Sequence, residues 1–215
     1  AAAERDPREE AAARYSILNV SSTKESLLPT PGSTSRLMAL AQRALESGVA
    51  AQHALVTLKT HRTIASLLAR RSGSRDEALR HVDECLALAV TARQPHDEAV
   101  CSWLEASILR ESHPAKARAA HSRALEATAR ANSPVTQAYS AGRQMRLSWD
   151  MNTPADAIRD SLAAIAAIET LRRLQDDAES SAELFSSWTL DYYWLSGRLL
   201  RDHRDTELDL AFSIT

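Results

Sequence analysis

Four prolines recur at nearly constant spacing, and this feature constrains the fold more than any other. They lie 19, 20 and 20 residues apart, at Pro95, Pro114, Pro134 and Pro154. Proline is tolerated in the first turn of a helix and breaks a helix interior, so each one predicts a new helix start. Helix-starting Ser, Asn or Thr residues precede the last three. The spacing therefore predicts helices of about 16–20 residues joined by short turns.

Composition supports the same fold class. Ala and Leu dominate the 215 residues, and aromatic residues make up only 5%. Ala, Leu, Arg and Glu have high helix propensity, whereas segments rich in Val, Ile, Thr and Tyr, which favour strands, are missing. Earlier in the chain, Gly48 and the Ser72-Gly73-Ser74 segment predict further turns between helices.

Small side chains recur with a period of two helices. Each pair is seven residues apart, and successive pairs are offset by 39 and then 40 residues: Ala78 with Cys85, Ala117 with Ala124, and Ala157 with Ala164. A leading copy falls at Leu37 and Ala44, and a trailing copy at Leu208 and Thr215. Self-similarity at a fixed period of this length is typical of stacked helical repeats. The small residues are expected where two helices approach closely.

The pattern predicts a domain layout. Residues 1–34 are expected to hold an N-terminal helix and a long loop rich in Pro, Ser and Thr over 21–34, and residues 35–215 a repeat array of about four hairpins. Helices are expected near 8–20, 35–47, 49–71, 75–93, 96–111, 114–131, 135–149, 154–174, 177–202 and 205–215. The chain begins with Ala and stops within an expected helix, so we expect it to be a piece of a longer protein.

Two segments resemble the tetratricopeptide repeat family. They are Ala138-x-x-Ala141-Gly142-x-x-Met145, leading to Ala157, and Tyr193-x-x-Ser196-Gly197-x-x-Leu200, leading to Leu208 and Phe212. The resemblance implies an all-α, right-handed superhelical solenoid of antiparallel helix pairs. Three features depart from the family pattern: a period near 40 rather than 34, Leu208 at a position for a small residue, and Glu105 at an inward position.

No catalytic, metal or cofactor site is expected. Cys85 occupies a repeat position that elsewhere holds Ala, so we interpret it as a packed small residue, and Cys101 lies among apolar neighbours. His81 and Cys85 are four residues apart and could share a metal, but no second pair of this kind exists. The chain also lacks a Gly-rich phosphate loop and known nucleophile motifs.

A binding groove is the functional feature that the resemblance implies. In tetratricopeptide arrays the first helix of each hairpin lines a concave face. We place the small residue of the first helices at Ala65, Ala106, Gly142 and Gly197. Counting along each helix from this residue gives the candidate lining residues: Arg62, Arg70, Trp103, Arg110, Tyr139, Arg143, Arg146, Trp194, Arg198 and Arg201. Two alternatives stay open: Trp103 and Trp194 pack between hairpins, or the arginines are merely solvated. Trp149 and Trp188 are expected in the core or at hairpin edges.

Arginines and aromatic side chains in one groove suit an acidic partner. Arg presents a planar fork to carboxylates, and Trp or Tyr gives a large contact area at low entropic cost. We therefore expect an acidic peptide, or an acidic surface of a partner protein in a larger complex. The formal charge of −2 gives no net basic field. The same residues would suit single-stranded nucleic acid, but the chain has no Lys-rich stripe, so this ligand ranks third. No apolar run is long enough to cross a membrane, and two cysteines make no disulfide framework.

The expected role is that of a cytoplasmic, bacterial interaction module, which acts as the sensing arm of a multidomain protein. The terminal hairpin, from Tyr192 to Phe212, resembles the last repeat before the protease domain of bacterial caspase-like CHAT proteins. The alternative owner is a large transcriptional activator with helical repeats of about 40 residues. An enzyme acting within this chain is the rival class. The reading frame beyond Thr215 distinguishes the two owners: an α/β region with a His and a later Cys would support the protease, and a helix-turn-helix would support the activator.

Overall fold

A computed structural model describes residues 6–27, 30, 32–151, 154–174 and 191–201 of the chain. The chain divides into two compact units, Ala1–Ala131 and Asn132–Thr215, which are treated separately below as unit 1 and unit 2. Apart from turns, the described residues are helical, which confirms the predicted all-α class. None of the described helices combines the length and apolar character needed to span a membrane.

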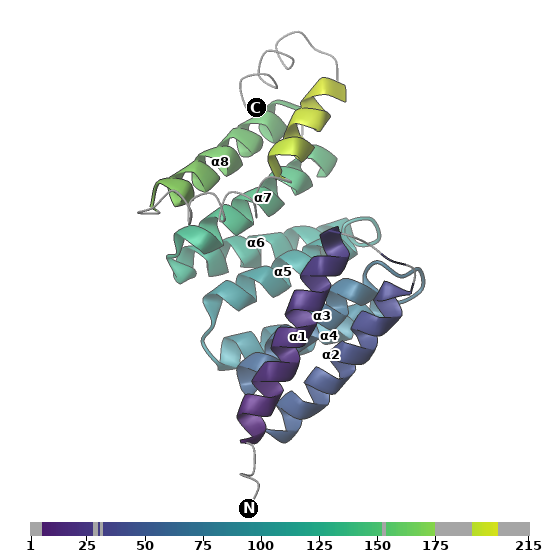
Figure 1. Cartoon of the computed structure of the whole chain (residues 1–215). Coiled ribbons are helices and arrows are strands. Elements are labelled where there is room, and N and C mark those ends of the chain that lie inside the picture. The colour runs from purple at the N-terminus through teal and green to yellow at the C-terminus, as the bar shows by residue number, and fades with distance from the viewer. Residues whose placement is uncertain (1–5, 28–29, 31, 152–153, 175–190, 202–215) are drawn as a thin grey trace, which may run out of the picture. The chain divides into compact units, whose positions relative to one another are not determined.

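Unit 1 consists of consecutive helices that pack side by side (Figure 1). They are α1 (Pro7–Leu27), α2 (Ser33–Ala50), α3 (Ala54–Leu68), α4 (Arg75–Thr91), α5 (Pro95–Leu109) and α6 (Pro114–Ala131). Each odd-numbered helix packs most extensively on the even-numbered helix that follows it. In addition, α1 contacts α3 and α3 contacts α5, so first helices of successive pairs are neighbours. This arrangement is consistent with a helical repeat.

The described residues of unit 2 form one helix pair and a further helix. The pair is α7 (Pro134–Met151) and α8 (Pro154–Arg173), and the further helix covers residues 191–201, drawn in yellow in Figure 1. Leu195 and Leu199, both fully buried, join Met145 of α7 and Ala164 of α8 in one apolar cluster. The helix of residues 191–201 therefore packs against both members of the pair.

The proline spacing is confirmed as a set of helix starts. Helices α5, α6, α7 and α8 each begin at a proline of the series. The turns before them include residues in the left-handed backbone region, with φ of 52° at Arg93 and 44° at Asn132. Gly73, with φ of 79°, occupies the turn between α3 and α4, and a left-handed conformation favours Gly or Asn.

The repeat of small residues also matches burial. The predicted positions of α2, α4, α6 and α8 are all at most 5% exposed: Leu37, Ala44, Ala78, Cys85, Ala117, Ala124, Ala157 and Ala164. In the first helices, Ala65 and Ala106 are fully buried and Gly142 is buried as well. Gly197 differs, because it is exposed and a Cβ added there would meet nothing within 4 Å. The pairs α3–α4, α5–α6 and α7–α8 thus follow the expected register.

Two local predictions were wrong. Helix α1 continues to Leu27 through the Ser21-Ser22-Thr23 segment, which was expected to be part of a loop. Thr23 Oγ1 donates a 3.0 Å hydrogen bond to the Asn19 carbonyl, and such a bond lets a hydroxyl residue stay inside a helix.

Gly48 was expected in a turn but lies in the last turn of α2. A Cβ added at Gly48 would lie 2.9 Å from Thr57 Oγ1 and 3.2 Å from the Thr57 backbone nitrogen, so glycine is needed for the approach to α3. Of the expected helix at 177–202, the described residues include 191–201; the expected helix at 205–215 lies outside them.

We predict that Ala124→Phe lowers the free energy of unfolding by about 1–3 kcal/mol, because α6 has no room at this position for a larger side chain. Ala124 is fully buried, and the matched control is Ala119→Phe, on the exposed face of the same helix. Urea unfolding followed by circular dichroism measures both. Equal stability of the two variants would contradict the assigned register.

Candidate functional site

The groove candidates of unit 1 do not form one exposed cluster. Arg62 of α3 donates from Nη1 to Asp97 Oδ1 of α5 at 3.0 Å, and Asp97 is only 3% exposed. Burial of a carboxylate requires such a cationic partner. Arg62 therefore joins two first helices of unit 1, and its charge is matched within the chain.

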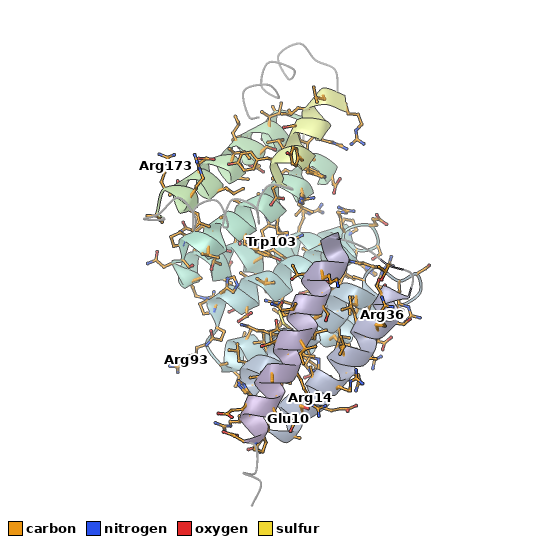
Figure 2. The ribbon with its side chains drawn as sticks, viewed as in Figure 1. Glu10, Arg14, Arg36, Arg93, Trp103 and Arg173 are labelled. Carbon is orange, nitrogen blue, oxygen red and sulfur yellow. A yellow bond between two sulfur atoms is a disulfide. The ribbon has the colours of Figure 1, made fainter. Side chains whose placement is uncertain are left out.

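Trp103 of α5 lies in the interior. Figure 2 labels this side chain. Trp103 is 4% exposed, and its ring centroid lies 4.7 Å from that of His121 on α6. Glu105, whose inward position departed from the family pattern, is bound by Arg123 of α6. The α5–α6 pair is therefore held by both apolar and ionic contacts.

The remaining candidates of unit 1 lie at the ends of first helices. Arg70 is exposed just beyond the end of α3. Arg110 caps the end of α5 with a guanidinium nitrogen 3.6 Å from Glu111 Oε1. In both cases the positive charge lies near a helix C-terminus, where the helix dipole stabilises it.

Unit 2 brings the other candidates together as arginine–aromatic pairs. The guanidinium carbon lies 5.0 Å from the ring centroid in Arg143–Tyr139, 4.9 Å in Arg146–Trp194 and 5.3 Å in Arg198–Trp149. All three distances lie within the range of cation–π attraction. Trp149 was expected in the core; it is 9% exposed, and its Nε1 donates to Ser161 Oγ at 2.9 Å.

Arg146 also forms an ion pair with a carboxylate of unit 2. Its Nε and Nη2 lie 3.1 and 2.6 Å from Asp191 Oδ1. Arg146 therefore binds Asp191 and covers Trp194 at the same time, so it fixes the helix of residues 191–201 on α7. This role is structural, and it reduces the capacity of Arg146 to bind a partner.

Exposed side chains gather on one face of the helix of residues 191–201. Tyr193 is 68% and Leu200 40% exposed, and Arg201 is exposed beside Leu200. Residues 193, 197, 200 and 201 are spaced for one helix face. On α7, Arg143 is exposed while it stacks on Tyr139. These residues are the surface aromatic and cationic groups of the candidate site.

A cysteine pair and a histidine pair in unit 1 were not recognised from the sequence. Cys85 of α4 and Cys101 of α5, both fully buried, form a disulfide with a Cα–Cα distance of 6.3 Å. His61 of α3 and His81 of α4 face each other with their Nδ1 atoms 2.8 Å apart. The interpretation of Cys85 as a packed residue holds, but its partner is Cys101, and His81 turns to His61 instead of toward Cys85. The two cysteines are 16 residues apart and the two histidines 20 residues apart, each about the length of one helix with its turn. This spacing was the sequence signal that the members of each pair lie on neighbouring helices.

The described residues contain no group of three or more His, Cys, Asp or Glu side chains that could hold a metal ion. Comparison with protein-family models, with curated proteins and with solved structures found no match to this chain. The assignment of function therefore depends on the geometry described above.

We predict that Tyr192→Phe lowers the free energy of unfolding of unit 2 by about 1 kcal/mol at pH 7. Tyr192 Oη donates to Glu169 Oε1 at 2.7 Å, and this bond, with a smaller contribution from Arg172, lowers the pKa of Glu169 below its ordinary value. A lowered pKa gives stability that is present above the unfolded value and lost as the pH falls through the folded value. Urea unfolding at pH 7 and pH 3 should therefore show a difference between wild type and variant at pH 7 that shrinks at pH 3.

We also predict that reduction of the Cys85–Cys101 disulfide lowers the free energy of unfolding by about 3 kcal/mol, the value expected for a closed loop of this size. Urea unfolding with and without dithiothreitol measures the change. The Cys85→Ala/Cys101→Ala variant is the control, because the reductant should leave its unfolding curve unchanged. An equal effect of reductant on both proteins would contradict the disulfide as the cause.

Proposed function

We propose that the chain is a protein-interaction module of the tetratricopeptide type, which binds an acidic peptide or an acidic surface of a partner protein. The observation that carries this proposal is the exposed Arg143, which stacks on the ring of Tyr139 in unit 2. Arg143 and Tyr139 lie on α7, and the exposed Tyr193, Leu200 and Arg201 lie on the helix of residues 191–201. The resemblance assigns both helices the place of first helices in the repeat. In the resembling family, first helices supply the binding face.

Stacking on an aromatic ring prepares an arginine for binding. The ring restricts the side chain and displaces water from one face of the guanidinium, while the N–H groups at its edge can still donate to a carboxylate. Less side-chain entropy is then lost when a ligand binds. Arg143, exposed and stacked on Tyr139, has this arrangement.

Four of the candidate arginines divide into a pair bound by carboxylates of this chain and a pair exposed to solvent. Arg62 and Arg146 bind Asp97 and Asp191 of this chain, which supports a structural role for both. Arg143 and Arg201 are exposed. The proposal therefore depends on the second group, with Tyr193 and Leu200 as the apolar part of the contact.

Binding without catalysis is the role proposed for this chain, as a regulatory arm of a larger bacterial protein. The resemblance to repeats that precede a CHAT protease domain motivates the finer proposal that partner binding controls such a domain. A cytoplasmic location is part of the same proposal. The Cys85–Cys101 disulfide weighs against this location, because disulfides are rare in reducing compartments.

Selection from a random peptide library, with equal numbers of acidic and basic members, tests the proposal. We expect acidic peptides that contain an apolar anchor to be enriched, and their affinity to fall as salt is raised because exposed charges are screened. The Arg143→Glu/Arg201→Glu variant should bind the selected peptides at least about tenfold more weakly, since each reversal replaces attraction with repulsion. Fluorescence polarisation measures the affinities.

The matched control is Arg43→Glu/Arg118→Glu, which makes the same charge change on exposed positions of the second helices α2 and α6. Equal loss in both variants would indicate a general charge effect and contradict a site on unit 2. Enrichment of basic peptides, or preferential binding of a single-stranded oligonucleotide, would overturn the acidic-partner proposal.

A further inference from the structure

The contact between His61 and His81 is unusual for two side chains of the same type. Their Nδ1 atoms lie 2.8 Å apart, and their ring centroids lie 5.0 Å apart with an interplanar angle of 42°. A neutral imidazole carries one N–H and one lone pair, and a doubly protonated ring carries two N–H groups. Two Nδ1 lone pairs, or two Nδ1–H groups, would repel at this distance. One ring donates its Nδ1–H to the Nδ1 lone pair of the other, and a metal ion can take the place of this shared proton.

We infer that His61 and His81 form a two-histidine site for a divalent transition-metal ion, with Nδ1 of each ring as one ligand. Helix α3 supplies one ring and α4 the other, so the ion would link the two helices of one pair. This site is separate from the arginine–aromatic pairs of unit 2 and does not depend on the proposed function.

The distance between the nitrogens favours a particular coordination geometry. With metal–nitrogen bonds of about 2.0–2.1 Å, two ligands at a right angle lie about 2.8–3.0 Å apart, and two ligands at the tetrahedral angle lie about 3.3–3.4 Å apart. The observed 2.8 Å matches the right angle. Square-planar and tetragonal sites of this kind are typical of Cu²⁺ and Ni²⁺. Zn²⁺ would require the two rings to move apart by about half an ångström.

The surroundings are compatible with such an ion. Burial lowers the pKa of both histidines, and the facing ring lowers that of His61 further; both effects favour the neutral, metal-binding form of each ring. The carboxylate of Glu84 acts on both rings and that of Glu77 on His81, while Arg80 opposes them. Both glutamates are exposed on α4.

The carboxylates and water complete the proposed coordination. In the structure no third protein ligand among the described residues is already in place. An exposed carboxylate can reach the ion by changing rotamer, and water can occupy the other positions, as in open metal sites. When both rings are neutral, binding shifts the shared proton from Nδ1 to Nε2 of the same ring, so that both rings are Nε2–H tautomers and no proton is lost.

Titration of the untagged protein with Cu²⁺, in the presence of glycine as a competing ligand, tests the inference. We expect one ion per chain, electron paramagnetic resonance with hyperfine coupling to two imidazole nitrogens, and a melting temperature raised by about 3 °C at tenfold excess over Kd. His61→Gln and His81→Gln should each weaken binding by about tenfold or more, because each leaves a single imidazole.

His96→Gln is the matched control, because His96 is also half-buried and its pKa is also lowered by burial. This variant should bind Cu²⁺ as the wild type does. Loss of binding in His96→Gln, or unchanged binding in His61→Gln and His81→Gln, would overturn the inference. If the variants do not fold, substoichiometric Cu²⁺ added to the wild type decides the matter by nuclear magnetic resonance: the paramagnetic ion should broaden the ring signals of His61 and His81 first, and unbroadened signals would overturn the site.

Discussion

Close approach of two helices through small side chains is the constraint on which the rest of the structure depends. Ala78, Ala117 and Ala157 are at most 1% exposed, and each recurs about one period after the last. A helix pair held in this way buries little apolar area per residue, since alanine contributes only a methyl group. Stability must therefore come from many such contacts repeated along the chain, as in other stacked repeats. Because the small residues fix which face of each helix is buried, they also fix which side chains remain on the surface.

Polar contacts supply the specificity that an alanine-rich core lacks. Small, uniform side chains pack acceptably in more than one register, whereas a buried carboxylate has few acceptable partners. The Asp97–Arg62 pair between α3 and α5 is one such contact, and the Trp149–Ser161 hydrogen bond between α7 and α8 is another. Each would be broken by rotation of one helix about its axis. In both units, polar atoms thus select one arrangement from several that the apolar surfaces would permit.

The sequence predicted the features that repeat, and it did not predict those that occur once. Proline spacing gave the helix starts, and the small residues gave the buried faces, because both depend on local backbone geometry and period. The partner of a given side chain depends instead on the rotation and shift of a neighbouring helix, and one residue of error turns a side chain by about 100°. For this reason the same lining positions include the buried Trp103, the paired Arg62 and the exposed Arg143. The cysteine and histidine pairs were missed for the same reason.

The polar contacts of the two units differ in kind. In unit 1, α3, α4 and α5 are joined by the His61–His81 contact, the Cys85–Cys101 disulfide and the Arg62–Asp97 ion pair. Three links of different chemistry among three helices restrict their relative motion more than apolar packing alone. In unit 2 the arginines stack on aromatic rings, and part of this set is exposed to solvent. Within unit 2 itself, stacking on Tyr139 restricts the exposed Arg143 side chain, so under the proposed function less free energy would be lost in ordering it when a partner binds.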